Sequence, residues 1–105
     1  MTVRILRRPK AAQDAESIAD YIAETSLKAA VRFLENTEST LMELAESPGA
    51  GSAFESVHPE LADLRFRRVK GFPNHFVFFI EHKDAIEVVR ILHGARDLDT
   101  ELRMI

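Results

Sequence analysis

The residues best suited to chemistry stand near the end of the chain, in the segment VVRILHGARD at positions 88–97. This segment carries His93 together with Arg90, Arg96 and Asp97. An imidazole can exchange a proton near neutral pH, and a guanidinium group can hold a phosphate. These residue types could therefore belong to an active site that transfers protons and holds a phosphate.

Residues elsewhere could complete such a site. Arg65 and Arg68 would join Arg90 in holding the phosphate, because one guanidinium group can donate two hydrogen bonds to phosphate oxygens. A carboxylate base, if one is needed, would be Glu60 or Asp63.

A structural role explains the segment more simply, and we favour it. His93 and Gly94 would end a core strand, while Arg96 and Asp97 would fix the next turn through hydrogen bonds and an ion pair. No metal site is expected, since the chain has no cysteine and its four histidines lack ligand spacing. No cofactor is expected either, because no glycine-rich phosphate loop is present.

Two helices must follow a short N-terminal strand that stops at Pro9. From Lys10, apolar residues recur at helical spacing up to Thr25, and Ser26 would cap the next helix. That second helix ends at residues 47–49, and the short break between the two predicts an antiparallel hairpin. The stripe of the second helix consists of Ala30, Phe33, Leu34, Thr37, Leu41, Leu44 and Ala45.

A loop over 49–62 leads into a mostly antiparallel three-strand meander, with strands over 64–69, 76–80 and 86–92. A turn is predicted at 71–74. The order β-α-α-β-β-β gives an α+β fold, in a single domain over residues 1–105. The last two strands are apolar on both faces, so both faces should be covered. Because the helical hairpin covers one face only, we expect a second protein on the other.

Charge is distributed unevenly along the chain. From Asp14 to Glu46 there are eight acidic residues against Lys28 and Arg32, and Asp14 suits the positive end of the first helix. A basic cluster would either protect an edge strand or meet an acidic partner, and it consists of Arg65, Arg67, Arg68 and Lys70. The rest of the chain, outside residues 14–46, has 12 basic and 9 acidic residues, and this modest basic excess argues against strong general nucleic-acid binding. Neither a signal peptide nor a membrane-spanning run is evident, so we expect a cytoplasmic protein.

The element order and several motifs resemble the RelE/ParE superfamily of bacterial toxin–antitoxin pairs, and its ParE branch in particular. The resemblance runs over about residues 3–98, through DYIA, AA-RFL, L-ELAESPGAGS, R-VKGFPNHFVFF and IEVVRILHGARDL. It implies a non-enzymatic toxin that inhibits DNA gyrase. It also implies a ParD-like antitoxin that covers the toxin, contacts operator DNA and represses the operon with it as a hetero-oligomer.

Two alternatives stay open beside the gyrase toxin. A RelE-like messenger-RNA endoribonuclease would use His93, Arg90, Arg68 and Arg65, but that branch typically has a tyrosine near its C-terminus. The only tyrosine here is Tyr21, which weakens the nuclease interpretation. The other alternative is a chain that serves chiefly as an antitoxin-bound co-repressor. Candidate residues for contact with target or antitoxin are Arg65, Arg67, Arg68, His93, Arg96, Leu102 and Ile105.

Arg90 is the one charged residue between Val88 and Leu92. Burying an unpaired guanidinium costs several kcal/mol, so Arg90 should be paired or should reach the edge of the sheet. The candidate partners are Asp63, Glu81 or an acidic group of the antitoxin. We expect a role weighted toward the fold.

Overall fold

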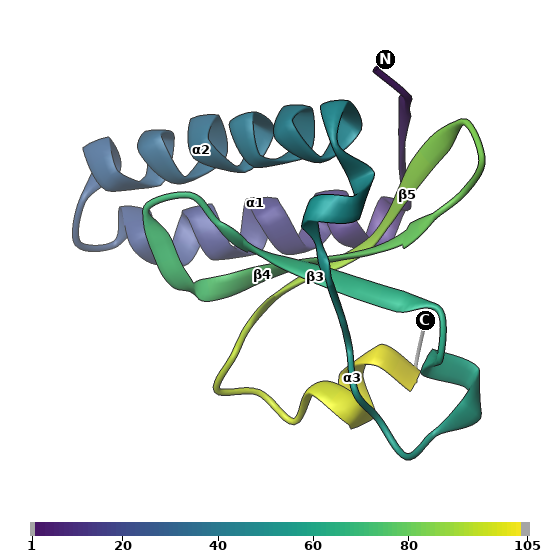
Figure 1. The fold of residues 1–105 in the computed structure, drawn as a ribbon. Coiled ribbons are helices and arrows are strands. Elements are labelled where there is room, and N and C mark those ends of the chain that lie inside the picture. Colours follow the sequence, from purple (N-terminus) through teal and green to yellow (C-terminus); the bar gives the residue numbers. More distant parts are fainter. Residues whose placement is uncertain (1, 104–105) are drawn as a thin grey trace.

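A helical hairpin and a short C-terminal helix lie on opposite sides of one sheet in the computed structural model, which describes residues 2–103 (Figure 1). The elements in chain order are β1 (Arg4–Arg7), α1 (Pro9–Ala23), α2 (Leu27–Glu46), β2 (Ser52–Ala53), β3 (Leu64–Val69), β4 (Phe72–Glu81), β5 (Ala85–His93) and α3 (Leu98–Arg103). Two short 3-10 turns, Pro48–Ala50 and Pro59–Leu61, stand before β2 and β3. The predicted α+β fold is confirmed.

The hairpin forms where the periodicity predicts it. α1 begins at Pro9 itself, because a proline at the first helical position loses no hydrogen bond. The Ser26 side chain caps α2 by accepting a hydrogen bond of 3.1 Å from the backbone N–H of Ala29. The predicted stripe of α2 is buried except for Leu34, whose exposed fraction is 41%. Phe33 is fully buried and anchors α2 on the sheet.

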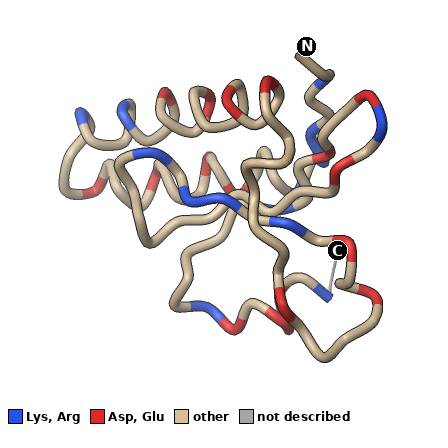
Figure 2. The backbone as a smooth tube through the Cα atoms, viewed as in Figure 1, with Lys and Arg blue, Asp and Glu red and all other residues tan. Residues whose placement is uncertain are grey.

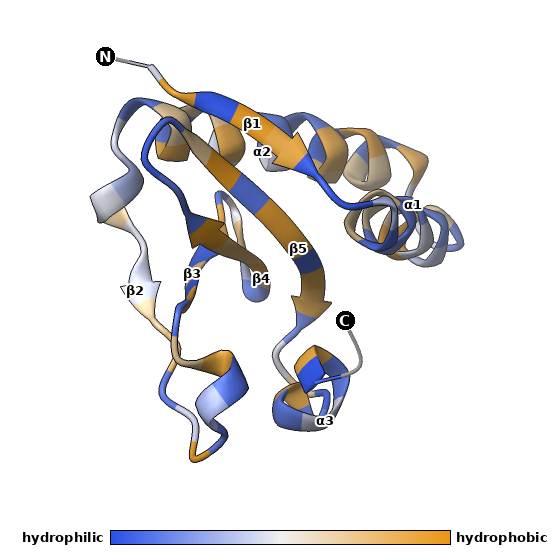
Figure 3. Cartoon of the chain, turned by 90° about the vertical axis from the view of Figure 1, so that its right-hand side faces the viewer, coloured by the Kyte–Doolittle hydropathy of each residue, from blue (hydrophilic) through white to orange (hydrophobic). Residues whose placement is uncertain are grey.

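The sheet has the strand order β1-β5-β4-β3-β2 (Figure 3). β1 pairs with β5 in parallel, from Arg4 opposite Ala85 to Arg7 opposite Val88. The other three pairings are antiparallel. β1 covers only the first half of β5, so the second half has β4 on one side and no strand on the other. This half ends at His93 and carries Arg90.

The turn between β3 and β4 is tighter than predicted. β4 begins at Phe72 rather than at residue 76, and Phe72 pairs with Val69. Gly71 makes the short turn possible, because its φ of 75° lies in the left-handed region that favours glycine. Residues 72–75 thus belong to a strand, which places His75 directly opposite His93 on β5.

Two apolar clusters fill the two faces of the sheet. One lies under the hairpin and includes Phe33, Leu41 and Phe79. The other lies on the opposite face and includes Phe78 and Leu102. α3 and the loop before β3 contribute apolar side chains to this second cluster, so the chain itself covers part of the face on which a second protein was expected. Sequence reasoning treated residues 98–105 as a tail and missed this short helix.

Within residues 2–103, no helix combines the length and apolar character that crossing a membrane requires.

Candidate functional site

Arg90 and Asp14 form a buried ion pair. Arg90 projects from β5 and is 4% exposed. Its Nε and Nη2 donate to the two carboxylate oxygens of Asp14 on α1, at 2.7 and 3.0 Å. The backbone N–H of Ile91 donates to the same carboxylate at 3.0 Å. Asp14 therefore takes the place of a neighbouring strand where β1 has ended.

The remaining guanidinium nitrogen of Arg90, Nη1, faces α3. Its Nη1 donates to the backbone carbonyl of Glu101 at 3.2 Å and lies 3.5 Å from the Glu101 carboxylate. Arg90 therefore joins α1 to α3 across the end of β5. The hydrogen bonds to Asp14, followed by the attraction of both carboxylates, outweigh burial and raise the pKa of Arg90 above its ordinary value.

The prediction that Arg90 must be paired is confirmed, but its predicted partners are wrong. Asp63 is exposed before β3 and Glu81 is exposed at the end of β4, and neither contacts Arg90 among the described residues. Spacing could not reveal Asp14, since it lies 76 positions from Arg90. Asp14 was expected to interact with the positive end of the first helix. In the structure it forms this buried pair with Arg90 instead.

The turn after β5 is built as the structural interpretation predicts. Gly94 donates from its backbone N–H to the Asn74 carbonyl at 2.8 Å. The Asp97 carboxylate accepts from the backbone N–H of Thr100 at 3.3 Å and from its hydroxyl at 2.8 Å, which caps α3. The ion pair of Arg96 is with Glu101, at 2.9 Å. These contacts turn the chain sharply from β5 into α3.

His93 lies half-buried at the end of β5. Its Nδ1 accepts a hydrogen bond of 2.9 Å from the backbone N–H of Ala95, so Nε2 carries the ring proton in the neutral form. The ring stands edge-on to His75, with 4.9 Å between the ring centres. Burial, and then the neighbouring His93, lower the pKa of His75. Sequence reasoning took His75 for an edge residue before a strand.

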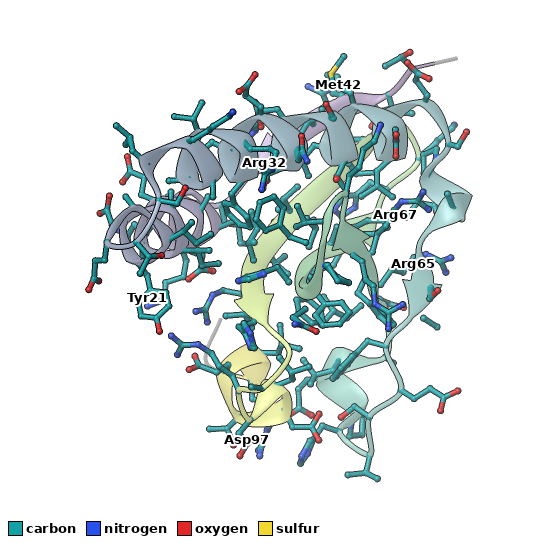
Figure 4. All side chains as sticks on the ribbon, turned by 90° about the vertical axis from the view of Figure 1, so that its left-hand side faces the viewer. Tyr21, Arg32, Met42, Arg65, Arg67 and Asp97 are labelled. Atoms are coloured by element: carbon teal, nitrogen blue, oxygen red, sulfur yellow. The ribbon has the colours of Figure 1, made fainter. Side chains whose placement is uncertain are left out.

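The basic cluster becomes a strip along β3, visible as blue segments in Figure 2. The basic strip consists of Arg65, Arg67, Arg68 and Lys70. Arg65 and Arg67 donate to the backbone carbonyls of Gly51 and Ala50, the latter at 3.1 Å. Figure 4 shows both side chains on the side of the sheet toward β2. The two arginines therefore hold the segment before β2 against β3.

The remaining part of the basic strip is more accessible. Arg68 is exposed and its guanidinium lies over the Phe76 ring, 5.6 Å from the ring centre. Lys70 and Arg67 lie 3.9 and 3.6 Å from the Glu43 carboxylate on α2. β2 pairs with only two residues of β3, so the end of β3 from Arg67 onward is a sheet edge.

The residues of a nuclease site do not come together here. Arg65 and Arg68 are three positions apart on β3, so their side chains point to opposite faces of the sheet. Arg90 is bound to Asp14. Glu60, the carboxylate candidate, lies 2.9 Å from Arg103. A hydrogen bond from the backbone, and then the contact with Arg103, lower the pKa of Glu60, which makes it a weaker base.

Leu102 and Ile105 were also predicted to contact the target or the antitoxin. Leu102 is fully buried against the second face of the sheet, which corrects its assignment to a surface that contacts a partner. Its side chain covers Phe78 and Val89 instead of facing solvent. Ile105 lies outside the described residues. Between residues 2 and 103, no three His, Asp or Glu side chains gather as metal ligands would.

Comparison with known proteins identifies one family. The family model described as the ParE toxin of the type II toxin–antitoxin system parDE matches residues 5–98. A solved structure described as a chromosomal ParDE system from P. aeruginosa superposes with a TM-score of 0.69. The two chains are 18% identical, over 88% of this chain and 96% of the other.

A second solved structure, described as a YoeB/ParE toxin from Agrobacterium tumefaciens, superposes with a TM-score of 0.57. It is 16% identical and covers 86% of this chain and 96% of its own. At such identities the two structures establish the fold. A search of curated protein sequences finds no match.

Proposed function

The chain belongs to the ParE family of toxins from type II toxin–antitoxin systems, and from this premise we propose that it acts by inhibiting DNA gyrase. The match over residues 5–98 carries this proposal. In the same proposal, a ParD-like antitoxin neutralises the chain, contacts operator DNA and represses the operon together with it in a hetero-oligomer. The chain acts in the cytoplasm by binding and not by catalysis.

The dispersal of the nuclease candidates supports binding over catalysis. Cleavage of a phosphodiester needs an acid, a base and cations within reach of one phosphate. Arg90 is already bound to Asp14, and the Arg65 side chain holds the carbonyl of Gly51. Either arginine would have to leave these contacts before it could hold a phosphate.

The basic strip favours a partner segment that carries acidic residues, and Arg68 is one of its exposed members. Arg68 has no acidic partner among the described residues and rests on Phe76. A carboxylate of the antitoxin would gain a charged contact there without breaking an existing one. We therefore place the antitoxin, or the target, along the exposed edge of β3.

A pair of assays on the purified full-length chain tests the target. We expect the chain to stop supercoiling by gyrase and to accumulate cleaved DNA, and to leave messenger RNA on translating ribosomes intact. Addition of the antitoxin should reverse the effect on gyrase. In cells without antitoxin, expression should cause filamentation and a DNA-damage response. Cleavage of ribosome-bound messenger RNA with no effect on gyrase would replace the proposal by the nuclease alternative.

A charge-reversal pair tests the partner surface. Arg68→Glu should weaken antitoxin binding at least about fivefold, because it places a carboxylate where we expect the partner's own. Lys83→Glu makes the same change of charge in the exposed turn between β4 and β5, and should leave binding unchanged. Equal losses in the two variants would show that net charge, and not the basic strip, determines binding.

A further inference from the structure

A cleft of about 660 Å³ lies between α1 and the end of β5, outside the basic strip. Its apolar walls come from Ile18 and Ile22 on α1 and from Ile91 on β5. Tyr21 stands at its rim with 75% of its surface exposed, and Figure 4 shows this side chain projecting below α1. A concave apolar surface of this size is typical of a binding site for a small group or a side chain.

The polar groups that face the cleft are mostly donors. The Nδ1 of His93 accepts from Ala95, so Nε2 carries the ring proton in the neutral form, and this N–H has no hydrogen-bond partner among residues 2–103. The Arg96 guanidinium borders the cleft with its side chain 59% exposed, and only its Nη1 contacts Glu101. His75 makes no side-chain hydrogen bond with any described residue, and its lowered pKa keeps the ring neutral near neutral pH.

The one carboxylate in the cleft is already satisfied. Asp14 accepts hydrogen bonds from the Arg90 side chain and from the backbone N–H of Ile91, and its charge is neutralised by Arg90. It therefore offers little attraction to a cation. The donors of His93 and Arg96 that have no partner among the described residues favour a ligand that accepts hydrogen bonds and carries negative charge.

We propose that this cleft binds a partner protein through an apolar side chain accompanied by a carboxylate. The apolar side chain lies against Ile18 and Ile22 and covers the His93 ring, and the carboxylate lies at the rim between His93 and Arg96. The site is separate from the basic strip and does not depend on whether gyrase is the target.

A peptide fits these features better than a nucleic acid does. A nucleic acid carries a phosphate at every residue, and α1 presents the exposed acidic residues Asp20 and Glu24 next to Tyr21. These acids repel a polyanion, whereas a single carboxylate near Arg96 keeps clear of them. The apolar walls have no role in holding a phosphate but bury a hydrocarbon side chain.

Titration of the full-length chain with 3-phenylpropionate, followed by amide NMR, tests the site. This probe joins a hydrocarbon ring to one carboxylate. We expect saturable shifts confined to the amides of residues 17–22 and 91–96, with a dissociation constant on the order of 1 mM for so small a compound. The neutral analogue 3-phenylpropanol should bind several-fold more weakly. Non-saturable or scattered shifts would contradict the proposal.

Matched variants separate the carboxylate contact from general charge. Arg96→Gln should weaken 3-phenylpropionate about fivefold, near the upper end for an exposed ion pair, and should leave 3-phenylpropanol unchanged. Arg103→Gln removes a second exposed arginine, which is paired with Glu60 outside the cleft, and should change neither. Tyr21→Ala should weaken both compounds. Equal effects of the two arginine variants would overturn the proposal, and so would tighter binding of a short thymidine oligonucleotide to the same amides.

Discussion

Arg90 binds a carboxylate that lies 76 positions earlier in the chain, and this pair fixes α1 to the half of β5 that extends beyond β1. With Arg90 removed, Asp14 would keep its charge at 13% side-chain exposure without a cation beside it. Removing one partner of a buried pair costs far more than the pair contributes, because the remaining charge is stranded. A substitution that removes only Arg90 should therefore lower the stability by more than the intact pair contributes to it.

Arg90→Ala should lower the free energy of unfolding by about 3–5 kcal/mol. Arg96→Ala, which breaks an exposed pair with Glu101, should cost about 1 kcal/mol or less. Urea unfolding of both variants measures the difference. Toxicity of Arg90→Ala should fall only in proportion to the folded protein that is lost. A variant that stays as stable as the parent, binds antitoxin and is not toxic would assign Arg90 to the target instead.

His75 makes stability depend on pH. Its pKa lies below the ordinary 6.5, first because burial disfavours the charged ring and then because of His93. Above 6.5 neither the folded nor the unfolded chain holds the proton, so the full stability is present. As the pH falls below that value, the unfolded chain takes up the proton first, and the free energy of unfolding decreases.

The loss through this one proton cannot exceed about 1.4 kcal/mol per pH unit. Urea unfolding at a series of pH values should show a shallower decrease for His75→Gln than for the parent. His58→Gln serves as the control, since it keeps His75 and should keep the parent's slope. A His75→Gln protein with the parent's pH dependence would rule out this role.

The elements show which parts of the fold could be predicted from sequence. α1, α2 and the three long strands were predictable because each has a long apolar pattern of its own period. β2 and α3 were not, since a two-residue strand and a six-residue helix are too short to show a period. Their positions depend on distant contacts, such as that of Leu102 with the second face of the sheet. The cleft was missed for the same reason, because Tyr21 and His93 meet only in the folded chain.

At the scale of the elements, Gly51 lets the chain just before β2 lie close to β3 and to the Phe79 ring. A Cβ at Gly51 would lie 2.7 Å from Cε1 of the buried Phe79 ring and would also touch its Cζ atom. Gly51→Ala should therefore cost about 1–3 kcal/mol, as overpacking of a core does. Gly49→Ala is the matched control, because its Cβ would meet nothing within 4 Å. Thermal unfolding that ranks the two variants in the opposite order would contradict this account.

At the scale of the whole molecule, one sheet serves two apolar clusters, so neither face should unfold alone. Leu102→Ala removes a fully buried side chain and should cost about 2–5 kcal/mol. Val57→Ala, at a position 87% exposed, should change stability by less than about 0.5 kcal/mol. The fluorescence of Tyr21 reports on α1, on the other side of the sheet, and should change together with the circular dichroism. Separate transitions would show that the two layers unfold independently.

The parallel pairing of β1 with β5 also sets the moment at which the protein becomes able to act. The strand that enters the sheet first in sequence has its partner at residues 85–88, close to the end of the chain. A ribosome must therefore complete almost the whole message before β1 can dock, and contacts between such distant segments form slowly. Nascent chains stalled before Ala85 should be open to protease along α1 and α2. Synthesis of this toxin thus carries a built-in delay between the start of translation and the completion of the sheet.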